Sequence, residues 1–389
     1  MIDLTDVPIV DNPVHPWRES VKRVDASELV GHVTFSECVV TSVREEYLPI
    51  EQLEEPLRLF RQTSLSSRYF LVELAKLLDV EENWDAIAEA RNRHSEPDLR
   101  GWSERLFRSA GVNTLMVDEG GSRPRITLDE LGAIAPARLR RVARSDNFIR
   151  DLLPQEESWS GFFNRFQEEL QAAIDDGAMA FKTVIAYRTG LDIQQVSEAD
   201  ARSNFESSRT APELEQKPLR DFLVCHTMDV ARANGLWTHI HAATGDPDIQ
   251  FQRSNPGQLY PLLHSKRFRG NKVVLIHGGW PWVSEAAAMV GILPNVYLDV
   301  SEGSIFGMGN LRQRIMEAFE FCPYAKILYS SDASTPETLW AVARRYKSAL
   351  GRVLAELTAE GFFSPREAYQ AGQMIMGGNA ARLYGLDLP

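Results

Sequence analysis

The sequence predicts an α/β fold, a (β/α)8 barrel with a helical insertion after its first strand. Three short apolar runs each end in a side chain that can bind a metal or move a proton: Trp237–His241, Val273–His277 and Ile327–Asp332. A fourth candidate, Pro8–His15, lies near the N-terminus. In a parallel barrel all strands end at one face, where catalytic side chains collect. Strand ends so far apart in the chain meet only if the sheet closes into a barrel. Because the side chains that would meet there can bind a metal or move a proton, the pattern favours a metal-dependent enzyme.

The first part of the chain reads as one strand followed by helices. Residues 7–15 are the expected first strand. Residues 68–78 carry apolar side chains at helical spacing, and Asn83 is a suitable N-cap for the helix that follows. We therefore expect a helical insertion at residues 45–110, within a single barrel domain that spans residues 1–389.

Strands two to four come next, and their apolar runs are less regular. We expect these strands at residues 114–118, 139–146 and 178–188. The apolar side chains of residues 159–176 recur at roughly four-residue spacing, which predicts an amphipathic helix. This helix lies between the third strand and the fourth. Residues 197–218 are charged and contain two prolines, which fits either a loop or an exposed helix.

From residue 219 onward, helices and strands alternate regularly. Such alternation is typical of a parallel sheet whose crossover connections are helices. The expected helix and strand pairs are residues 219–234 and 236–241, 256–265 and 273–277, 283–290 and 295–300, and 311–321 and 327–332. The remaining chain, residues 337–386, is expected to be helical.

Composition favours a soluble enzyme over a nucleic-acid-binding or membrane protein. The 389 residues are 44% hydrophobic and carry a formal charge of −12, so neither nucleic acid nor an anionic membrane is an expected partner. No apolar run is long enough to span a membrane, and no signal-peptide pattern opens the chain. Cys38, Cys225 and Cys322 are too few and too scattered for a disulfide scaffold. We expect a cytoplasmic homo-oligomer that acts on a small molecule.

The strongest candidates for chemistry are three histidines and one aspartate. His239 and His241 are two residues apart and face the same side of a strand, where a barrel interior normally carries aliphatic side chains. His277 precedes two glycines, which let a substrate approach closely. Asp332 ends the last strand, where it can bind a metal or act as a general base. The alternatives are buried histidines satisfied by hydrogen bonds and, for Asp332, a helix N-cap.

Four further side chains are weaker candidates. Lys182 interrupts an apolar strand, and an interior lysine needs a compensating anion or a lowered pKa, unless it points outward between helices. Arg144 and Arg188 follow other strand ends and can each bind a substrate carboxylate through two hydrogen bonds, unless they form surface ion pairs. His15 follows the first strand and is weak evidence alone. The glycine motifs of serine hydrolases, phosphate-binding loops and dinucleotide-binding folds are absent.

Four segments resemble the amidohydrolase-related family, in particular the branch that also occurs fused to glutamine-synthetase-like domains. They are residues 180–191, 217–221, 323–332 and 378–385. The expected insertion after the first strand is similar to that of uronate isomerases. The resemblance covers nearly the whole chain and is clearest over residues 110–386. It implies a distorted (β/α)8 TIM barrel with a metal at its C-terminal face.

The resemblance also implies a set of metal ligands. The family typically supplies a His-x-His pair from strand one, histidines from strands five and six, and an aspartate from strand eight. By position these are His15, His241, His277 and Asp332. Pro13 stands where the family has the first histidine of the pair, and proline cannot bind a metal. Three possibilities follow. The metal is held by fewer protein ligands, His239 or Lys182 replaces the missing histidine, or the site holds no metal.

By resemblance, we expect hydrolysis of a C–N, amide-type bond in a small substrate that bears a carboxylate. The expected ligands of a divalent cation, zinc ahead of manganese, are His15, His241 and Asp332. Asp332 is also expected to activate water, and His277 to stabilise the oxyanion, while Lys182 contacts substrate or metal.

Substrate binding is expected at the same face of the barrel. The residues assigned to it are Arg188, Arg144, His239 and Trp280. A metal-dependent decarboxylase or lyase, a uronate-type isomerase and a non-catalytic barrel subunit remain open as alternatives.

Overall fold

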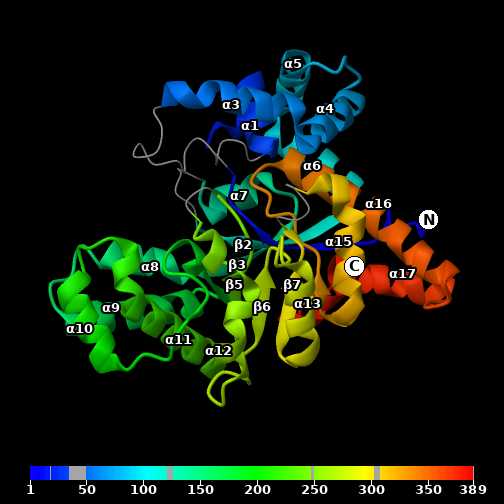
Figure 1. Cartoon of the computed structure of the whole chain (residues 1–389). Coiled ribbons are helices and arrows are strands. Elements are labelled where there is room, and N and C mark those ends of the chain that lie inside the picture. The colour runs from blue at the N-terminus through cyan, green and yellow to red at the C-terminus, as the bar shows by residue number, and fades with distance from the viewer. Residues whose placement is uncertain (18, 35–49, 121–125, 247–248, 302–306, 389) are drawn as a thin grey trace.

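Eight parallel strands form one sheet in the order β1 to β8 (Figure 1). The structure is a computed structural model, and it describes residues 1–388 except 18, 35–49, 121–125, 247–248 and 302–306. The strands are β1 Ile9–Val14, β2 Val112–Asp118, β3 Arg138–Arg144, β4 Ala180–Thr183, β5 Trp237–His241, β6 Val273–Ile276, β7 Val296–Asp299 and β8 Ile327–Leu328.

The barrel closes between β1 and the segment that follows the two-residue strand β8. His15 N donates to Ala333 O at 2.8 Å, and Asp332 N donates to Pro13 O at 3.2 Å. Ser330 Oγ also donates to Pro13 O, at 2.9 Å. These bonds replace a regular ladder, so the barrel is nearly closed. The predicted distorted (β/α)8 barrel is confirmed.

Helices surround the strands in the order that a barrel requires. The longer ones are α1 Ala26–Thr34, α3 Ile50–Thr63, α4 Leu65–Leu78, α5 Trp84–Ser95, α6 Leu99–Ala110, α7 Leu128–Ile134, α8 Ser145–Leu152, α9 Trp159–Asp175, α10 Glu198–Ser208, α11 Lys217–Ala233, α12 Tyr260–His264, α13 Val283–Ile292, α15 Leu311–Phe321, α16 Pro336–Ala359, α17 Pro365–Gln373 and α18 Asn379–Tyr384. None of the described helices is long and apolar enough to cross a membrane.

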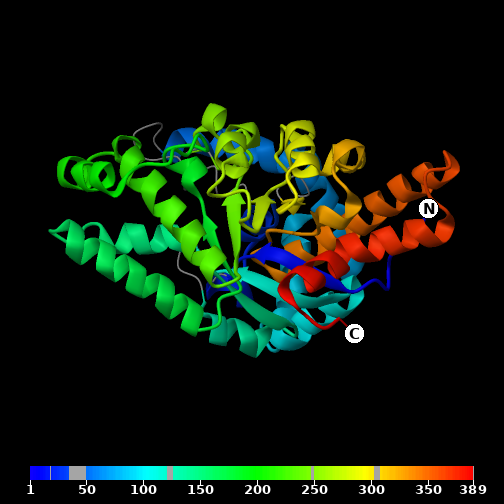
Figure 2. The ribbon, with the colours of Figure 1, turned by 90° about the horizontal axis from the view of Figure 1, so that it is seen from below.

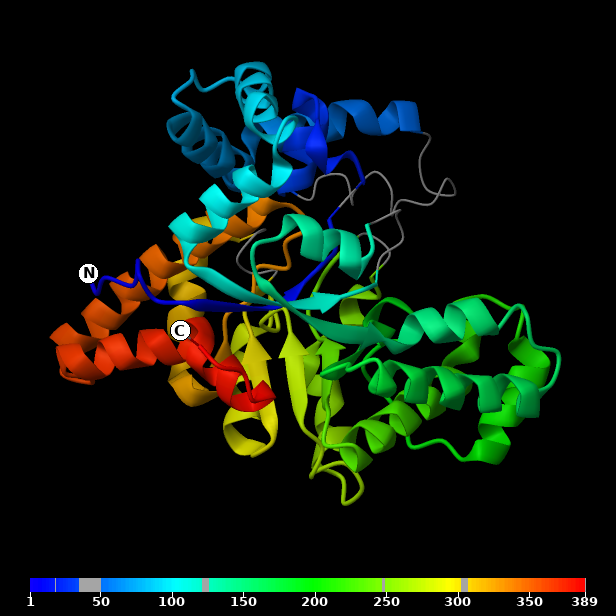
Figure 3. The same cartoon turned by 180° about the vertical axis from the view of Figure 1, so that it is seen from behind.

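The helices between β1 and β2 form one layer beside the barrel. Helices α3 to α6 lie there, and helices α8 to α11 gather on another side (Figures 1 and 3). Asn83 caps α5 as predicted, because its side chain accepts hydrogen bonds from Asp85 N and Ala86 N. Residues 45–49 of the expected insertion lie outside the described residues. The division of residues 1–389 into one domain with an insertion stays a prediction.

Several boundaries differ from the sequence-based expectation, and the last strand ends at Leu328 rather than at residue 332. The third strand ends at Arg144 rather than at residue 146, because α8 begins at Ser145. The fourth strand ends at Thr183, where the backbone enters a short 3-10 helix. Residues 198–208 are a helix whose face buries Phe205 among aromatic side chains of α9, which resolves the choice between loop and helix.

The N-terminal end of the barrel is sealed by helix α18. Trp237, the first residue of β5, donates through Nε1 to Leu383 O at 3.1 Å. Tyr384 is buried with Val10, Met116 and Val274 in the apolar barrel interior. Both chain ends lie on the side of α16 and α17 (Figure 2). Helix α18 therefore covers the N-terminal end of the barrel interior.

A buried ion pair ties the helices between β1 and β2 to the barrel. Arg91 of α5 and Glu337 of α16 are each 1% exposed, and Arg91 Nε lies 2.8 Å from Glu337 Oε1. Trp102 Nε1 donates to the same oxygen at 2.6 Å. Since the two groups are far from water, their stabilising effect depends on both partners being present.

We predict that Glu337→Ala destabilises the fold by ~3–5 kcal/mol, because it leaves the Arg91 charge and the Trp102 N–H unpaired. Denaturant unfolding followed by circular dichroism measures the change. The matched control is Glu206→Ala, which breaks an exposed pair with Arg202 and should change stability by less than ~1 kcal/mol. Equal effects of the two variants would contradict the prediction.

Candidate active site at the C-terminal ends of the strands

Seven titratable side chains from seven of the eight strands meet at the C-terminal end of the barrel. Each lies in the last part of its strand or directly after it, and each is buried or nearly so. They are His15, Asp118, Arg144, Lys182, His241, His277 and Asp332.

Asp118 is the centre of an ion cluster. Its Oδ2 lies 3.0 Å from Lys182 Nζ, and its Oδ1 accepts from Arg144 Nε at 3.1 Å. Arg144 Nη2 also donates to Oδ2, and Gly120 N donates to Oδ1. Burial alone would raise the pKa of Asp118, but Arg144, Lys182 and His15 outweigh burial and hold this pKa well below its usual range. Asp118 therefore stays ionised and compensates the charge of the buried Lys182.

His15 links this cluster to Asp332. His15 Nδ1 lies 3.1 Å from Asp118 O, and a carbonyl oxygen only accepts, so Nδ1 carries the proton. His15 Nε2 is then turned toward Asp332 Oδ1, at 3.4 Å. Burial would raise the pKa of Asp332, but His15 and Lys182 keep it below its usual value. The site thus contains a second ionised carboxylate.

His241 and His277 lie next to one another, with ring centroids 4.3 Å apart. His241 Nε2 donates to Thr244 O at 3.0 Å, which leaves the lone pair on Nδ1. Burial and the charge of Lys182 lower the pKa of His241 to about 3. Burial, His241 and Lys182 lower the pKa of His277 well below its usual value. Both rings are therefore neutral at neutral pH.

A hydrogen-bonded pair, Asp299 and Ser301, fixes His277. Asp299 Oδ1 accepts from His277 N at 2.9 Å and from Ser301 Oγ at 2.7 Å. Because the hydroxyl proton of Ser301 goes to Asp299, Ser301 Oγ accepts from His277 Nδ1 at 2.7 Å. His277 has a φ of 80°, which a non-glycine residue rarely adopts. The pair stabilises this backbone and leaves His277 Nε2 as an acceptor.

Asp11 and Ser331 play the same part beside Asp332. Asp11 Oδ1 accepts from Ser331 N at 2.7 Å, and Oδ2 accepts from Ser331 Oγ at 2.6 Å. Asp332 has a φ of 54°. Burial raises the pKa of Asp11 to about 8, so its role is to hold the chain rather than to supply charge.

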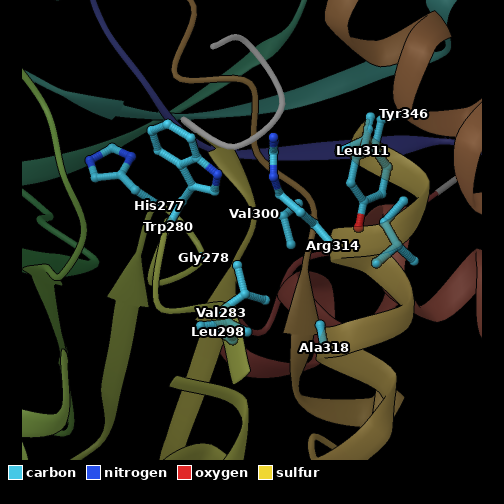
Figure 4. Close-up of a pocket in the computed structure, with 11 residues that line it drawn as sticks. His277, Gly278, Trp280, Val283, Leu298, Val300, Leu311, Arg314, Ala318 and Tyr346 are labelled. Carbon is cyan, nitrogen blue, oxygen red and sulfur yellow. The ribbon is translucent and has the colours of Figure 1, made fainter. Parts of the chain in front are cut away.

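Three of the four predicted substrate-binding residues lie outside this centre. His239 is fully buried beneath it, with Nε2 at 2.6 Å from Tyr384 Oη. Arg188 pairs with Glu213 Oε2 at 3.1 Å. Trp280 lies three residues after His277, and both residues line a small hollow at the ends of β6 and β7 (Figure 4). Arg144, the fourth, belongs to the centre, and its guanidinium is already bound to Asp118.

Sequence reasoning missed Asp118, Asp299 and Asp11 as site residues. Asp118 ends an expected strand, which is the signal that singled out Asp332, and Asp299 is the last residue but one of another. Asp11 lies inside the first strand, among apolar neighbours and prolines. In the sequence, each of the three carboxylates is an aspartate within or at the end of an expected strand, and that position is the signal that could have identified them.

The donor atoms suit a divalent cation. The imidazoles of His15 and His241 each have one nitrogen bound to a backbone carbonyl, as metal-ligating histidines usually do, which leaves His15 Nε2 and His241 Nδ1 as the candidate donor atoms. Asp332 Oδ1 is buried and makes no hydrogen bond to a described residue. Within the described part of the chain, however, three or more such side chains are not gathered into a ready-made site. The chemistry fits, and cation binding requires the side chains to draw together.

Comparison with known proteins agrees with the fold. A family model described as amidohydrolase matches residues 204–386. Protein fluG of Emericella nidulans is 29% identical over 339 residues, which cover 78% of this chain and 39% of that protein. The chain thus spans about two fifths of that relative's length.

Solved structures share the architecture. A protein of Lactobacillus casei, named as a candidate metal-dependent hydrolase, has a TM-score of 0.83 at 24% identity and covers 99% of this chain and 98% of its own. The uronate isomerase of Thermotoga maritima has a TM-score of 0.65 at 16% identity, covering 98% and 95%. The C-terminal half of the chain is thus similar to the amidohydrolase family, and the barrel as a whole is similar in fold to these solved structures.

We predict that Ser301→Ala changes the tautomer of His277. Loss of one buried hydrogen bond, ~1 kcal/mol, should change the ratio of the two neutral tautomers about 5-fold toward Nε2–H. Nitrogen-15 NMR of histidine-labelled protein measures it, with His277→Asn to assign the signal. Ser301→Thr keeps the hydroxyl and should retain the native tautomer. An unchanged His277 spectrum in Ser301→Ala would show that Ser301 does not orient the ring.

Proposed function

We propose that this protein is a metal-dependent hydrolase that cleaves a C–N, amide-type bond in a small substrate bearing a carboxylate. The observation that carries the proposal is an ionised carboxylate, Asp332, beside His15, with the neutral His241 and the ammonium of Lys182 at the same end of the barrel. Members of the amidohydrolase superfamily typically bind a divalent metal and act on small molecules.

The cation would be held by His15 Nε2, His241 Nδ1 and Asp332 Oδ1. Two imidazoles and one carboxylate suit zinc ahead of manganese, and Pro13 leaves a further position open for water or substrate. When bound there, a cation supplies Lewis acidity and makes water more acidic.

Asp332 and His277 have different roles toward the protons of water and substrate. Asp332 is held ionised by His15 and Lys182, so it can accept a proton from the attacking water. His277 Nε2 is an acceptor because Nδ1–H is bound to Ser301, so it can receive a hydrogen bond from water or from a substrate N–H. In this proposal His277 orients a donor, and the expected role as an oxyanion donor is not retained.

Lys182 is the group best suited to stabilise the oxyanion. Its ammonium has three protons, and Asp118 Oδ2 takes one of them at 3.0 Å. The remaining protons can face negative charge that develops on the substrate oxygen. In a buried site such a charge interaction is much stronger than in water.

The substrate carboxylate would exchange with Glu213. The Glu213 carboxylate lies between two arginines, 3.1 Å from Arg188 Nη1 and 3.2 Å from Arg220 Nη2. Burial lowers the pKa of Arg220, which means that its charge is only partly compensated. An incoming carboxylate can therefore occupy the Arg188 and Arg220 pair when Glu213 moves aside.

The test is a panel of N-acyl amino acids and dicarboxylic acid amides, assayed for released amine and for carbon dioxide. We expect amine release that falls at least ~10-fold after chelation and returns with zinc. Carbon dioxide without amine would favour a decarboxylase, and interconversion of uronates would favour an isomerase. Absence of bound metal and of any turnover would favour the non-catalytic barrel.

We predict that Lys182→Met lowers turnover by more than ~10-fold, because a charge aimed at the transition state is lost. The fold should survive, since Arg144 still pairs with Asp118. The control is Lys272→Met, which removes an exposed amine bound to Gly235 O. Steady-state kinetics and thermal unfolding measure both effects. Unchanged turnover in Lys182→Met would remove this residue from the mechanism.

A further inference from the structure

The turn that follows β5 is held by the segments on both sides of it. His241 Nε2 donates to Thr244 O at 3.0 Å. Thr244 N donates at 2.8 Å to Trp280 O, which follows β6, and Asp246 N donates at 3.1 Å to Tyr187 Oη, which follows β4. The carbonyl that fixes the His241 imidazole therefore lies in a turn whose position depends on hydrogen bonds to two neighbouring segments.

Tyr187 also contacts the imidazole itself. It is the last residue of the 3-10 helix Ile185–Tyr187, which follows β4. The ring centroids of Tyr187 and His241 lie 4.7 Å apart, with an angle of 62° between the ring planes. Aromatic rings attract each other in such edge-to-face arrangements. Tyr187 thus acts on His241 directly through its ring and indirectly, through the turn, with its hydroxyl.

Gly245 allows the tyrosine to approach this closely. A Cβ atom at residue 245 would collide with Tyr187 Oη, and it would lie 2.7 Å from Tyr187 Cζ and 3.3 Å from His241 Cε1. Only glycine leaves room for both rings at this position. The phenol, Gly245 and the imidazole therefore form one packed unit, in which a change at residue 245 also moves the other two groups.

The orientation and tautomer of His241 decide which nitrogen can bind a ligand. Because Nε2–H is bound to Thr244 O, the lone pair is on Nδ1. Outer partners of this kind fix the ring and the tautomer of a metal-ligating histidine, and their loss weakens metal binding. Thr244 O is such a partner, and Tyr187 holds the turn that carries it.

We propose that Tyr187 is a positioning residue for His241, which holds the imidazole with its ring and the Thr244 turn with its hydroxyl, so that Nδ1 keeps the lone pair. The inference deepens the proposed function, because His241 Nδ1 is one of the donor atoms assigned to the cation there. It rests on that function for cation binding but not for the tautomer, which is a property of the metal-free protein.

The first test is nitrogen-15 NMR of metal-free, histidine-labelled protein at neutral pH, with His241→Asn to assign the signals. Tyr187→Phe keeps the ring and removes the acceptor of Asp246 N. The loss of one hydrogen bond should move the ratio of the two neutral His241 tautomers about 5-fold toward Nδ1–H. The control is Tyr369→Phe, at an exposed tyrosine of α17, which should leave the spectrum unchanged. An unchanged His241 spectrum in Tyr187→Phe would overturn the proposal.

A double-mutant cycle separates positioning from general packing. Gly245→Ala should disturb the His241 tautomer in the wild-type background, because the new methyl group collides with Tyr187. In the Tyr187→Ala background that collision is absent, so Gly245→Ala should change the tautomer ratio by less than about 2-fold. Tyr187→Leu replaces Tyr187→Ala if the latter does not fold. Equal effects of Gly245→Ala in both backgrounds would also refute the proposal.

Zinc affinity is a second readout that does not depend on turnover. Calorimetric titration of the metal-free protein with zinc should show binding about 10-fold weaker in Tyr187→Phe than in the wild type. Zinc binding of unchanged affinity in this variant would overturn the role of Tyr187 toward the cation.

The outcome separates this inference from the proposed function. If the protein binds no zinc and hydrolyses no amide, but the His241 tautomer responds to Tyr187→Phe, the positioning role stands and the hydrolase proposal fails. If amides are hydrolysed, but neither the tautomer nor zinc affinity responds to Tyr187→Phe, the positioning role fails and the hydrolase proposal stands.

Discussion

The buried ion cluster at Asp118 is the interaction on which the active site depends. Lys182 and Arg144 come from neighbouring strands and would repel each other in a dry barrel if Asp118 did not lie between them. Their charges in turn keep the pKa of Asp118 well below its usual range. His15 joins the cluster through Asp118 O and carries its influence to Asp332. One carboxylate thus sets the charge balance in which the other groups of the site operate.

A second constraint is geometrical. His277 and Asp332 both have positive φ values, and each is held by an aspartate and a serine on the adjoining segment. Such backbone strain persists only where neighbouring groups fix it, and it is common at functional sites. At His277 the same hydrogen bonds also set the ring tautomer, so one device fixes both the position of the ring and its proton. The barrel brings the strand ends together, and the Asp299–Ser301 and Asp11–Ser331 pairs fix the backbone next to the site side chains.

Periodicity predicted the barrel well where strands are apolar and helices follow at once, as from residue 219 onward. It overran at β3 and β4, because the runs past Arg144 and Thr183 look extended in sequence but enter helix α8 and a 3-10 helix, and it overran at β8, which ends at Leu328. His241, His277 and Asp332 were predictable, since each ends an apolar run. Asp118 was not singled out, because its importance comes from Lys182 and Arg144 across the sheet. Likewise, the sequence does not indicate that Arg188 forms an ion pair with Glu213.

We propose that His15, His241 and the ionised Asp332 form a cation site beside the Asp118 cluster. The most direct measurement is a crystal structure of the zinc-incubated protein with anomalous data collected across the zinc edge. The account predicts one anomalous peak about 2.0–2.2 Å from His15 Nε2, His241 Nδ1 and Asp332 Oδ1, with Lys182 still paired to Asp118. A peak elsewhere, or a zinc ion bound by Asp118 after Lys182 has moved away, would contradict it.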